Sequence, residues 1–195
     1  MELNRISIIQ SYINKYNYKN YLEIGVQAGH CFSAIKCENK TGVDPDSSSA
    51  ATVHKTSDDF FAENKEKFDI IFIDGLHHAD TVLRDINNSL ECLAEGGTIL
   101  MHDCLPTNEF MQLIPLTTQC EWTGDTWKAY VMTRQQRSDV MQFVINCDWG
   151  VGCIRRGFQP LLNNSLELTY QNFEKYKHQW MNIISPSEFI KMMEQ

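Results

Sequence analysis

The sequence predicts a mixed α/β fold in which a mostly parallel β-sheet carries helices on both faces. Short apolar runs at 21–26, 68–73 and 98–101 have the composition of strands that are buried on both faces of such a sheet. Between the second and third runs, residues 79–93 place apolar side chains at helical spacing. Because strands that alternate with helices usually run parallel, we expect a layered α/β domain.

Length and charge limit the class of protein. The chain has 195 residues and 43% hydrophobic content, which predicts a single domain with a core at about 18–156 and a C-terminal helical extension at about 157–195. A net charge of −8 disfavours nucleic-acid and anionic-membrane partners. No apolar run reaches the about 18 residues of a membrane span, and the N-terminus lacks a signal-peptide pattern, so we expect a soluble, cytoplasmic protein.

The cysteines indicate a reducing compartment. Their number is odd and no two are spaced as Cys-x-x-Cys, so a disulfide framework or a structural zinc site is not expected. We expect free thiols at all seven positions, which are Cys31, Cys37, Cys92, Cys104, Cys120, Cys147 and Cys153.

The N-terminal elements form a ligand-binding pattern. Apolar residues at helical spacing predict a helix over 2–16, which either packs on the sheet or covers a ligand. After the strand at 21–26, Gly25 and Gly29 permit a tight turn in which the backbone passes close to a ligand. A helix over 28–36 then points its free N–H groups into the turn. Together these features indicate a nucleotide-type site.

An acidic residue on the next strand narrows the ligand. Asp44 ends the strand at 41–43, about twenty residues beyond Glu23, where a carboxylate can accept hydrogen bonds from a ribose diol. A dinucleotide fingerprint would need glycine at the positions of Gln27 and His30, so a pyrophosphate cradle is poorly supported. The pattern favours a nucleoside without pyrophosphate, and S-adenosylmethionine is such a ligand.

Shorter elements follow the strand at 41–43. We expect a short helix at 47–51, a weak strand at 53–56 and a helix at 59–67 that is capped by Ser57 and Asp58. The helix at 79–93 is then interrupted by two glycines, which begin the strand at 98–101.

Polar residues follow each expected strand of the parallel sheet. Ligands bind beyond the carboxyl ends of parallel strands, so these residues should meet at one rim. They are Glu23 and Gly25, Asp44, Ser57 and Asp58, Asp74 and His77, and His102 and Asp103.

The C-terminal half is expected to complete the sheet. Residues 105–124 suit an irregular loop that shapes an acceptor pocket. The further elements are a helix at 125–135, hairpin-spaced strands at 140–147 and 151–155, and helical segments at 166–180 and 186–193. Trp122, Trp127 and Trp149 are expected as core residues or pocket walls.

Several motifs occur together in the order of a known family. They are Glu23-x-Gly25-x-x-x-Gly29, Asp44, Asp74-Gly75-x-His77 and His102-Asp103. Over about 20–104 the chain resembles class I S-adenosylmethionine-dependent methyltransferases, and in particular a bacterial branch with Asp-Gly-x-His and His-Asp signatures that often methylates hydroxyls of sugars or other small metabolites. The resemblance implies a Rossmann-like, mostly parallel seven-stranded sheet with an antiparallel edge strand. The cofactor contacts that it implies are Glu23, Gly25, Gly29, Asp44, Ser57, Asp58 and Asp74.

A hydroxyl acceptor must lose its proton, which requires a general base or a metal ion. The resemblance implies His77 as the base, with Asp74 and His102 as further catalytic residues. Asp74, His102 and Asp103 also offer ligands for a divalent cation such as Mg²⁺. In cation-dependent relatives the neighbour of the residue matching Asp103 is acidic or an amide, whereas here it is His102 or Cys104.

Other functions fit parts of the same pattern. A metal-free methyltransferase could use His77 or His102 alone, and a metal-dependent hydroxylase could use the Asp/His/Asp set for non-haem iron. The missing glycines disfavour an NAD-linked oxidoreductase, and a non-catalytic nucleoside-binding module would need no turnover. The expected partner is a small-molecule acceptor, with a sugar as first candidate, and the sequence leaves open whether the chain forms a homo-oligomer.

Overall fold

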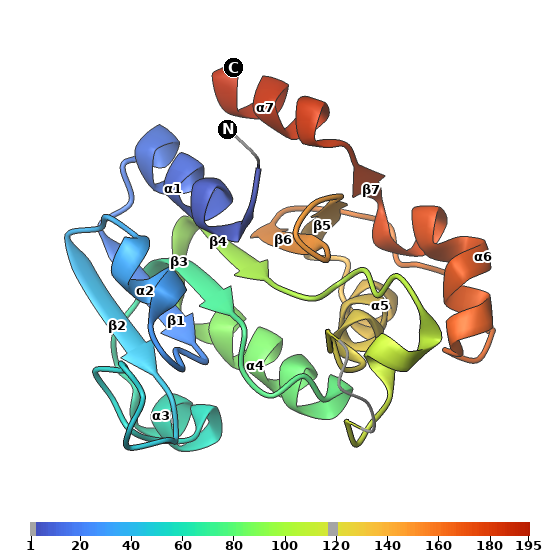
Figure 1. Cartoon of the computed structure of the whole chain (residues 1–195). Coiled ribbons are helices and arrows are strands. Elements are labelled where there is room, and N and C mark those ends of the chain that lie inside the picture. The colour runs from blue at the N-terminus through green and yellow to red at the C-terminus, as the bar shows by residue number, and fades with distance from the viewer. Residues whose placement is uncertain (1–2, 117–120) are drawn as a thin grey trace.

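Seven strands form one sheet in the computed structural model, which describes residues 3–116 and 121–195 (Figure 1). Across the sheet they are β2 (Asn39–Val43), β1 (Asn20–Ile24), β3 (Phe68–Ile73), β4 (Leu93–Met101), β6 (Val151–Arg156), β5 (Val140–Ile145) and β7 (Ile183–Ile184). The first four are parallel, and β6 is antiparallel to both of its neighbours. The predicted fold class, a mostly parallel α/β sheet, is confirmed.

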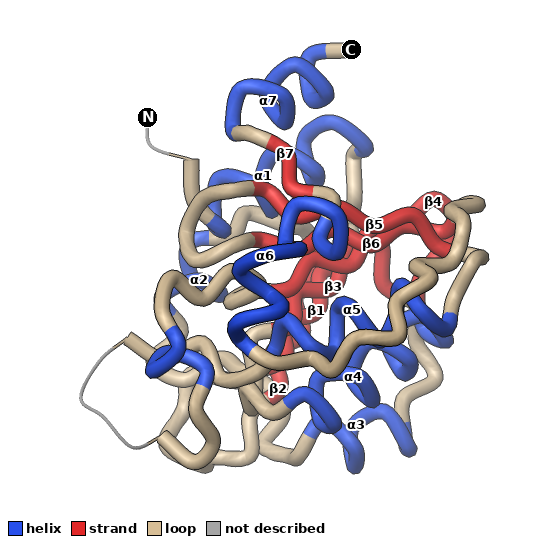
Figure 2. Tube along the Cα trace, turned by 90° about the vertical axis from the view of Figure 1, so that its right-hand side faces the viewer, coloured by secondary structure: helices blue, strands red, loops and turns tan. Residues whose placement is uncertain are grey.

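Helices cover both faces of this sheet (Figure 2). One face carries α3 (Ser57–Glu63), α4 (Ala79–Cys92), α5 (Thr126–Gln136) and α6 (Tyr170–Met181). The other face carries α1 (Arg5–Tyr16), α2 (His30–Ala34) and α7 (Pro186–Glu194). A short 3-10 helix, η1 (Glu109–Gln112), lies in the long loop after β4.

Strand β3 explains why the strongest strands read as continuous apolar runs. Ile71 and Ile73 pack into the core on the side of α4, whereas Ile70 and Phe72 pack into the core on the side of α1 and α2. Successive side chains of a strand point to opposite faces, so a strand between two helix layers is mostly apolar on both of them.

The two N-terminal helices differ from prediction in length. Helix α1 begins at Arg5 because Asn4 caps it, its side chain accepting a hydrogen bond from the Ser7 N–H at 3.0 Å. The expected start at Glu2 lies outside the described residues. Helix α2 covers only His30–Ala34 rather than 28–36, because Gly29 is left-handed and Ile35 turns extended to enter the core.

The segment between β2 and β3 contains three further corrections. Residues 47–51 form turns instead of a helix, because Asp46 accepts hydrogen bonds from the Ser48 and Ser49 N–H groups. The expected strand at 53–56 is reduced to a single bridge between Val53 and Val43. Helix α3 begins at Ser57 and ends at Glu63, and its cap is Thr56 rather than Ser57 or Asp58.

The sheet itself differs from prediction in two places. The antiparallel strand expected at the edge is β6, which lies inside the sheet between β4 and β5. The edge is formed by β7, a two-residue strand from the C-terminal extension that pairs with β5. Strand β4 starts at Leu93, directly after α4, and contains Gly97, where a Cβ would come within 2.8 Å of the Asp69 carbonyl oxygen.

The remaining helix and hairpin predictions agree with the described residues, except that α6 begins at Tyr170 rather than at 166. Helices α4, α5 and α7 and the hairpin of β5 and β6 lie where expected, and the loop at 105–124 is irregular apart from η1, with 117–120 outside the described residues. The cysteines that the structure describes are free thiols, and Cys120 lies outside it. Within 3–116 and 121–195, no helix is long and apolar enough to cross a bilayer.

Candidate active site

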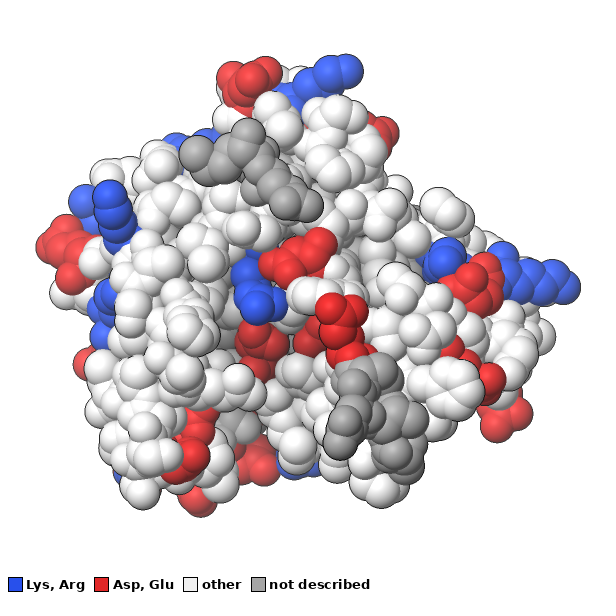
Figure 3. Space-filling model, in the orientation of Figure 1, with Lys and Arg blue, Asp and Glu red and all other residues white. Residues whose placement is uncertain are grey.

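The carboxyl ends of the parallel strands meet at one rim, as predicted. Two cavities open there, one of about 650 Å³ and one of about 310 Å³, and both are bordered by Gly25, Gln27, Ala28 and Asp74. On the face shown in Figure 3 the molecule is hollowed near the middle, and acidic side chains gather around the hollow. The two cavities are therefore adjoining parts of one site at the end of β1 and β3.

The glycine turn after β1 separates these cavities. Gly25 has φ +88°, and a side chain there would overlap the carbonyl oxygen of Asp74 at the end of β3. Gly29 has φ +78°, and its Cβ would lie 2.6 Å from that of Ala50. The Gln27 N–H donates a 2.8 Å hydrogen bond to Asp44 Oδ2, which ties the turn to the end of β2.

The larger cavity contains the residues that were expected to contact a nucleoside. Asp44 is buried, and its carboxylate accepts hydrogen bonds from the N–H groups of Gln27 and Asp46. Ser57 and Asp58, at the start of α3, also line this cavity. Asp58 forms an ion pair with Arg84 of α4, with 3.1 Å between Oδ2 and Nη2.

Glu23 lines the smaller cavity and is almost completely buried, with 1% of its surface exposed. Residues i and i+2 of a strand share a face, and the Tyr21 hydroxyl donates a hydrogen bond to the Glu23 carboxylate. Burial raises the pKa of Glu23 to about 7, although hydrogen bonds with Tyr21 and Cys31 oppose the shift. A cationic group of a ligand would favour the ionised form of this carboxyl.

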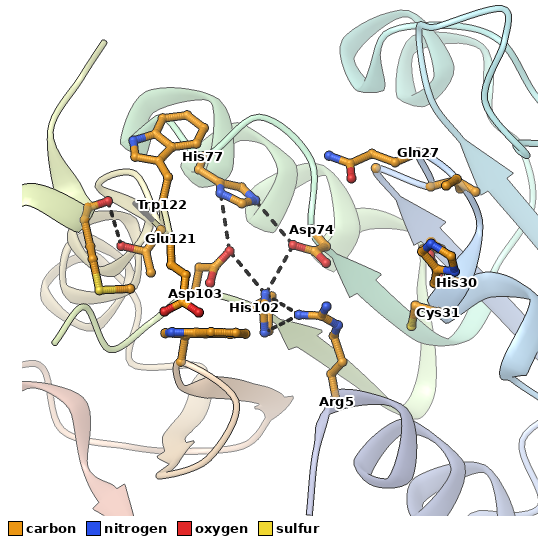
Figure 4. Close-up of a pocket in the computed structure, with 17 residues that line it drawn as sticks. Arg5, Gln27, His30, Cys31, Asp74, His77, His102, Asp103, Glu121 and Trp122 are labelled. Carbon is orange, nitrogen blue, oxygen red and sulfur yellow. Dashed lines mark hydrogen bonds and ion pairs between the residues drawn. The ribbon is translucent and has the colours of Figure 1, made fainter. Parts of the chain in front are cut away.

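The smaller cavity brings two imidazoles and two carboxylates together (Figure 4). His77 Nε2 lies 3.3 Å from Asp74 Oδ1, and its Nδ1 lies 3.3 Å from Asp103 Oδ2. The ring of His102 is also between these carboxylates, with Nδ1 at 3.1 Å from Asp103 Oδ2 and 3.4 Å from Asp74 Oδ1. The predicted meeting of Asp74, His77, His102 and Asp103 is thus observed.

The neighbouring imidazoles control the charge of Asp74. Burial alone would raise the pKa of this carboxyl, but hydrogen bonds from His102 and His77 outweigh burial and hold the pKa well below its ordinary value. For His77, burial lowers the pKa, whereas its contacts with Asp74 and Asp103 raise it above the ordinary value. Asp74 is therefore a carboxylate that orients the His77 ring.

The same cluster has the donor set of a divalent-cation site. Asp74, His102 and Asp103 each offer a ligand atom, and these atoms lie within 4.8 Å of one another. Asp103 has φ +61°, a left-handed conformation uncommon for a residue with a side chain. The adjacent Cys104 is fully buried, with its thiol directed at the carbonyl groups of Met101 and His102, so His102 and not Cys104 completes the set.

Two charged residues that the sequence did not single out, Arg5 and Asp148, contact His102. Arg5 Nη1 lies 2.6 Å from His102 Nε2, and Asp148 Oδ1 lies 3.3 Å from the same nitrogen. Burial lowers the pKa of His102, but hydrogen bonds with Asp103, Asp148 and Asp74 raise it to about 11. A guanidinium can donate only to an unprotonated nitrogen. The three carboxylates stabilise a positive charge on His102 more than the single guanidinium of Arg5 destabilises it, so the protonated form of His102 is favoured here. The protonated ring then repels Arg5.

Tryptophans form two walls of the smaller cavity. The indole of Trp122 stacks on His77, with 5.3 Å between ring centroids, and that of Trp149 stands edge-on to His102 at 6.1 Å. Trp127, in contrast, is a core residue. Gly124 follows Trp122 by two residues, and a side chain there would overlap the His77 backbone. The loop after residue 120 therefore fixes the position of His77.

The residues missed by sequence reasoning lie outside the strand ends. Arg5 is on the first turn of α1, Asp148 is in the turn between β5 and β6, and Asp85 is on the face of α4 that lines the larger cavity. The only local signal was the Asp-Trp-Gly sequence of the hairpin turn, which indicated a turn and not a contact with His102.

Comparisons with known proteins agree with this geometry. The sequence model of a family described as "Methyltransferase domain" matches residues 44–104, which begin directly after β2 and include β3 and β4. No curated protein matches the chain.

Several solved structures share the fold at low sequence identity. A methyltransferase of Podospora anserina with bound S-adenosylhomocysteine is 15% identical, with a TM-score of 0.58 and coverage of 78% of each chain. An O-methyltransferase of Bacillus cereus, also with S-adenosylhomocysteine, is 16% identical, with a TM-score of 0.53 over 78% of this chain and 80% of that one.

A third structure, with bound S-adenosylmethionine, is an O-methyltransferase of Streptomyces achromogenes involved in tomaymycin synthesis. It is 14% identical, with a TM-score of 0.53 over 76% of this chain and 78% of that one. The chain therefore has the Rossmann-like α/β fold of these methyltransferases.

Proposed function

We propose that this protein is an S-adenosylmethionine-dependent methyltransferase that methylates a hydroxyl group of a small molecule. One observation carries the proposal: a nucleoside-sized cavity at Asp44 adjoins a cavity that holds a histidine–carboxylate cluster, and the glycine turn separates them. A methyl donor bound across the turn would place its sulfonium between the two cavities. In-line transfer to an acceptor in the smaller cavity would then require mainly correct orientation.

The larger cavity would hold the adenosine part of the cofactor. Each oxygen of Asp44 accepts one backbone hydrogen bond and retains a further lone pair for a ribose hydroxyl. Ser57 and Asp58 line the part of the cavity proposed for adenine. Glu23, in the smaller cavity, would face the positively charged methionine end.

His77 is the proposed general base. If its Nε2–H donates to Asp74 Oδ1, the lone pair of Nδ1 is left free to accept a proton. In the described part of the chain this nitrogen is buried and lacks a hydrogen-bond partner, because the nearby Asp103 oxygen is not in bonding geometry. An acceptor hydroxyl in hydrogen-bond reach of Nδ1 could transfer its proton to His77 as the methyl group arrives.

Asp74, His102 and Asp103 would hold a divalent cation such as Mg²⁺, which the donor atoms fit. A bound cation would lower the pKa of the acceptor hydroxyl and fix its position. For His102 to be a ligand, its ring nitrogen facing the two carboxylates must be unprotonated. Asp148, which contacts the opposite ring nitrogen, and Arg5, which contacts both, would then determine its tautomer and orientation.

A sugar or a sugar-derived polysaccharide precursor is the first candidate for the acceptor. The smaller cavity has indole walls and several carboxylates, which suit an acceptor that presents both apolar ring faces and hydroxyl donors. The net charge of −8 disfavours a nucleic-acid or anionic-membrane substrate.

A metal-dependent hydroxylase is the second candidate, because an Asp/His/Asp set with open positions also suits non-haem iron. The two candidates differ in the cosubstrate that they need. A hydroxylase would consume oxygen with ferrous iron and would be unaffected by S-adenosylhomocysteine, which should inhibit a methyltransferase as its product.

Methyl-labelled S-adenosylmethionine tests the proposed function. The protein would be incubated with nucleotide sugars and small polyols, in EDTA and with added Mg²⁺, and the products separated and analysed for a labelled methyl ether. Ether formation that S-adenosylhomocysteine suppresses supports the proposal, and its dependence on Mg²⁺ tests the cation. Iron-dependent oxygen consumption without label transfer would favour the hydroxylase.

A further inference from the structure

Asp85 is a buried carboxyl that faces the larger cavity from α4. Only 1% of its surface is exposed, yet it lines the cavity together with Thr81, one helical turn earlier. Among residues 3–116 and 121–195, no group forms a hydrogen bond with Asp85 Oδ1. A buried acceptor without a partner costs free energy and calls for an explanation, such as a ligand that supplies the missing donor.

The charged neighbours of Asp85 do not neutralise it. Arg84, the adjacent cation, also lines this cavity, but its guanidinium pairs with Asp58 at 3.1 Å. Burial raises the pKa of Asp85 to about 6, whereas the hydroxyl of Ser57 opposes this shift. The missing partner of Asp85 is therefore a hydrogen-bond donor that enters the cavity between α3 and α4.

The expected orientation of the cofactor identifies this donor. With the ribose at Asp44, the base extends toward the part of the cavity lined by Ser57 and Asp58 of α3 and by Thr81 and Asp85 of α4. Adenine presents an exocyclic amine, which is a neutral donor of two hydrogen bonds. An oxopurine such as hypoxanthine presents a carbonyl oxygen at the same position, and two acceptors facing each other repel.

We propose that Asp85 accepts a hydrogen bond from the exocyclic amine of adenine and makes the cavity select an aminopurine over an oxopurine. This inference rests on the proposed function, because it assumes that the larger cavity holds the adenosine of S-adenosylmethionine. It assigns base selectivity to a residue of α4, outside the strand ends and the start of α3.

The same helix supplies a matched control. Ser89 lies one turn beyond Asp85, is fully buried, and also has a side-chain oxygen without a hydrogen-bond partner in the described structure. Ser89 does not line the larger cavity. A change at Ser89 therefore tests a buried polar group of α4 that cannot reach the base.

The test compares the affinity of S-adenosylhomocysteine with that of S-inosylhomocysteine, which carries an oxo group in place of the amine and a hydrogen on the adjacent ring nitrogen N1. We expect wild type and Ser89→Ala to bind the adenosyl compound at least about tenfold more tightly. In Asp85→Asn the side-chain amide can turn its NH₂ toward the oxo group, so the ratio should fall to about threefold or less. Asp85→Ser, whose hydroxyl both donates and accepts, should behave similarly.

Equal binding of both compounds by wild type would overturn the inference, as would an unchanged preference in Asp85→Asn or Asp85→Ser. The wild-type ratio tests the inference even if a variant fails to fold. Failure of wild type to bind either compound would instead contradict the proposed function itself, so the two failures are distinguishable.

Discussion

At the scale of single residues, Glu23 should make the stability of the folded chain decrease as the pH rises. Its pKa is raised from an ordinary 4.5 to about 7 in the folded chain. The folded state therefore favours the protonated form, and this stabilisation is complete below pH 4.5 and lost as the pH rises through 7. Relative to Glu23→Gln, the ligand-free wild type should lose about 3 kcal/mol of unfolding free energy over this range. Urea unfolding of both proteins at a series of pH values measures the difference, and parallel pH curves would contradict it.

Asp44 should be required for the cofactor. Asp44→Asn should weaken S-adenosylhomocysteine binding by about tenfold or more, because the amide cannot replace both acceptor oxygens. Asp69→Asn is the control, since Asp69 also accepts backbone hydrogen bonds, from Lys19 and Asn20, but at the opposite end of the sheet. It should reduce stability without changing affinity. Equal affinities in calorimetric titrations of both variants would remove Asp44 from the site.

His77 should be required for turnover and not for cofactor binding. Loss of a general base costs about 10²–10⁴ in rate, so His77→Gln should lower kcat by that factor and leave S-adenosylhomocysteine affinity within about threefold. His78→Gln is the matched control, because His78 is adjacent in sequence but does not line the smaller cavity. A His77→Gln enzyme with wild-type kcat would assign the proton transfer to another group, with His102 the next candidate.

At the scale of elements, the turn after β1 should tolerate no side chain. Gly25 and Gly96 both have positive φ, but a Cβ at Gly25 would overlap Asp74 whereas one at Gly96 meets nothing within 4 Å. Gly96→Ala should therefore cost only about 1 kcal/mol of backbone strain. Gly25→Ala should lower the Tm further and abolish cofactor binding. Thermal unfolding and titration of both variants test this, and similar behaviour of the two would contradict it.

Prediction from sequence succeeded for elements with a strong periodic signal. Strand β3 and helix α4 were located to within a residue, because β3 is apolar at every position except Asp69 and α4 has a clear apolar face. The helix expected at 47–51 was wrong, since the side chains of Asp46 and Ser49 accept hydrogen bonds from nearby backbone N–H groups. The strand expected at 53–56 is reduced to one bridge at Val53. The two-residue strand β7 is too short to carry a periodic pattern.

The site residues also divide into those that the sequence predicts and those that it does not. Glu23, Asp44, Asp74 and Asp103 follow buried strands, and the rule that parallel strands end at one rim is enough to bring them together. Arg5, Asp85 and Asp148 reach the site only through the packing of α1, α4 and the hairpin turn. Their contacts depend on tertiary structure that no local pattern specifies.

At the scale of the whole molecule, the site is assembled from segments that lie far apart in the described chain. Its lining begins at Arg5 in α1 and extends to Trp149, beyond β5, and the sheet holds these segments between the two helix layers. In the proposed function the adjoining cavities would serve the two halves of a methyl-transfer reaction, with the nucleoside on one side of the glycine turn and a proton-accepting cluster on the other. The proposed function depends on this separation of the site into two cavities.

Calorimetric titration of S-adenosylhomocysteine into the purified protein, in EDTA and again with Mg²⁺, tests most directly whether the larger cavity binds a nucleoside independently of the proposed cation site. We expect micromolar binding in both conditions, because the proposed cation ligands lie in the smaller cavity and the nucleoside contacts in the larger one. Absence of binding in both conditions would contradict the account.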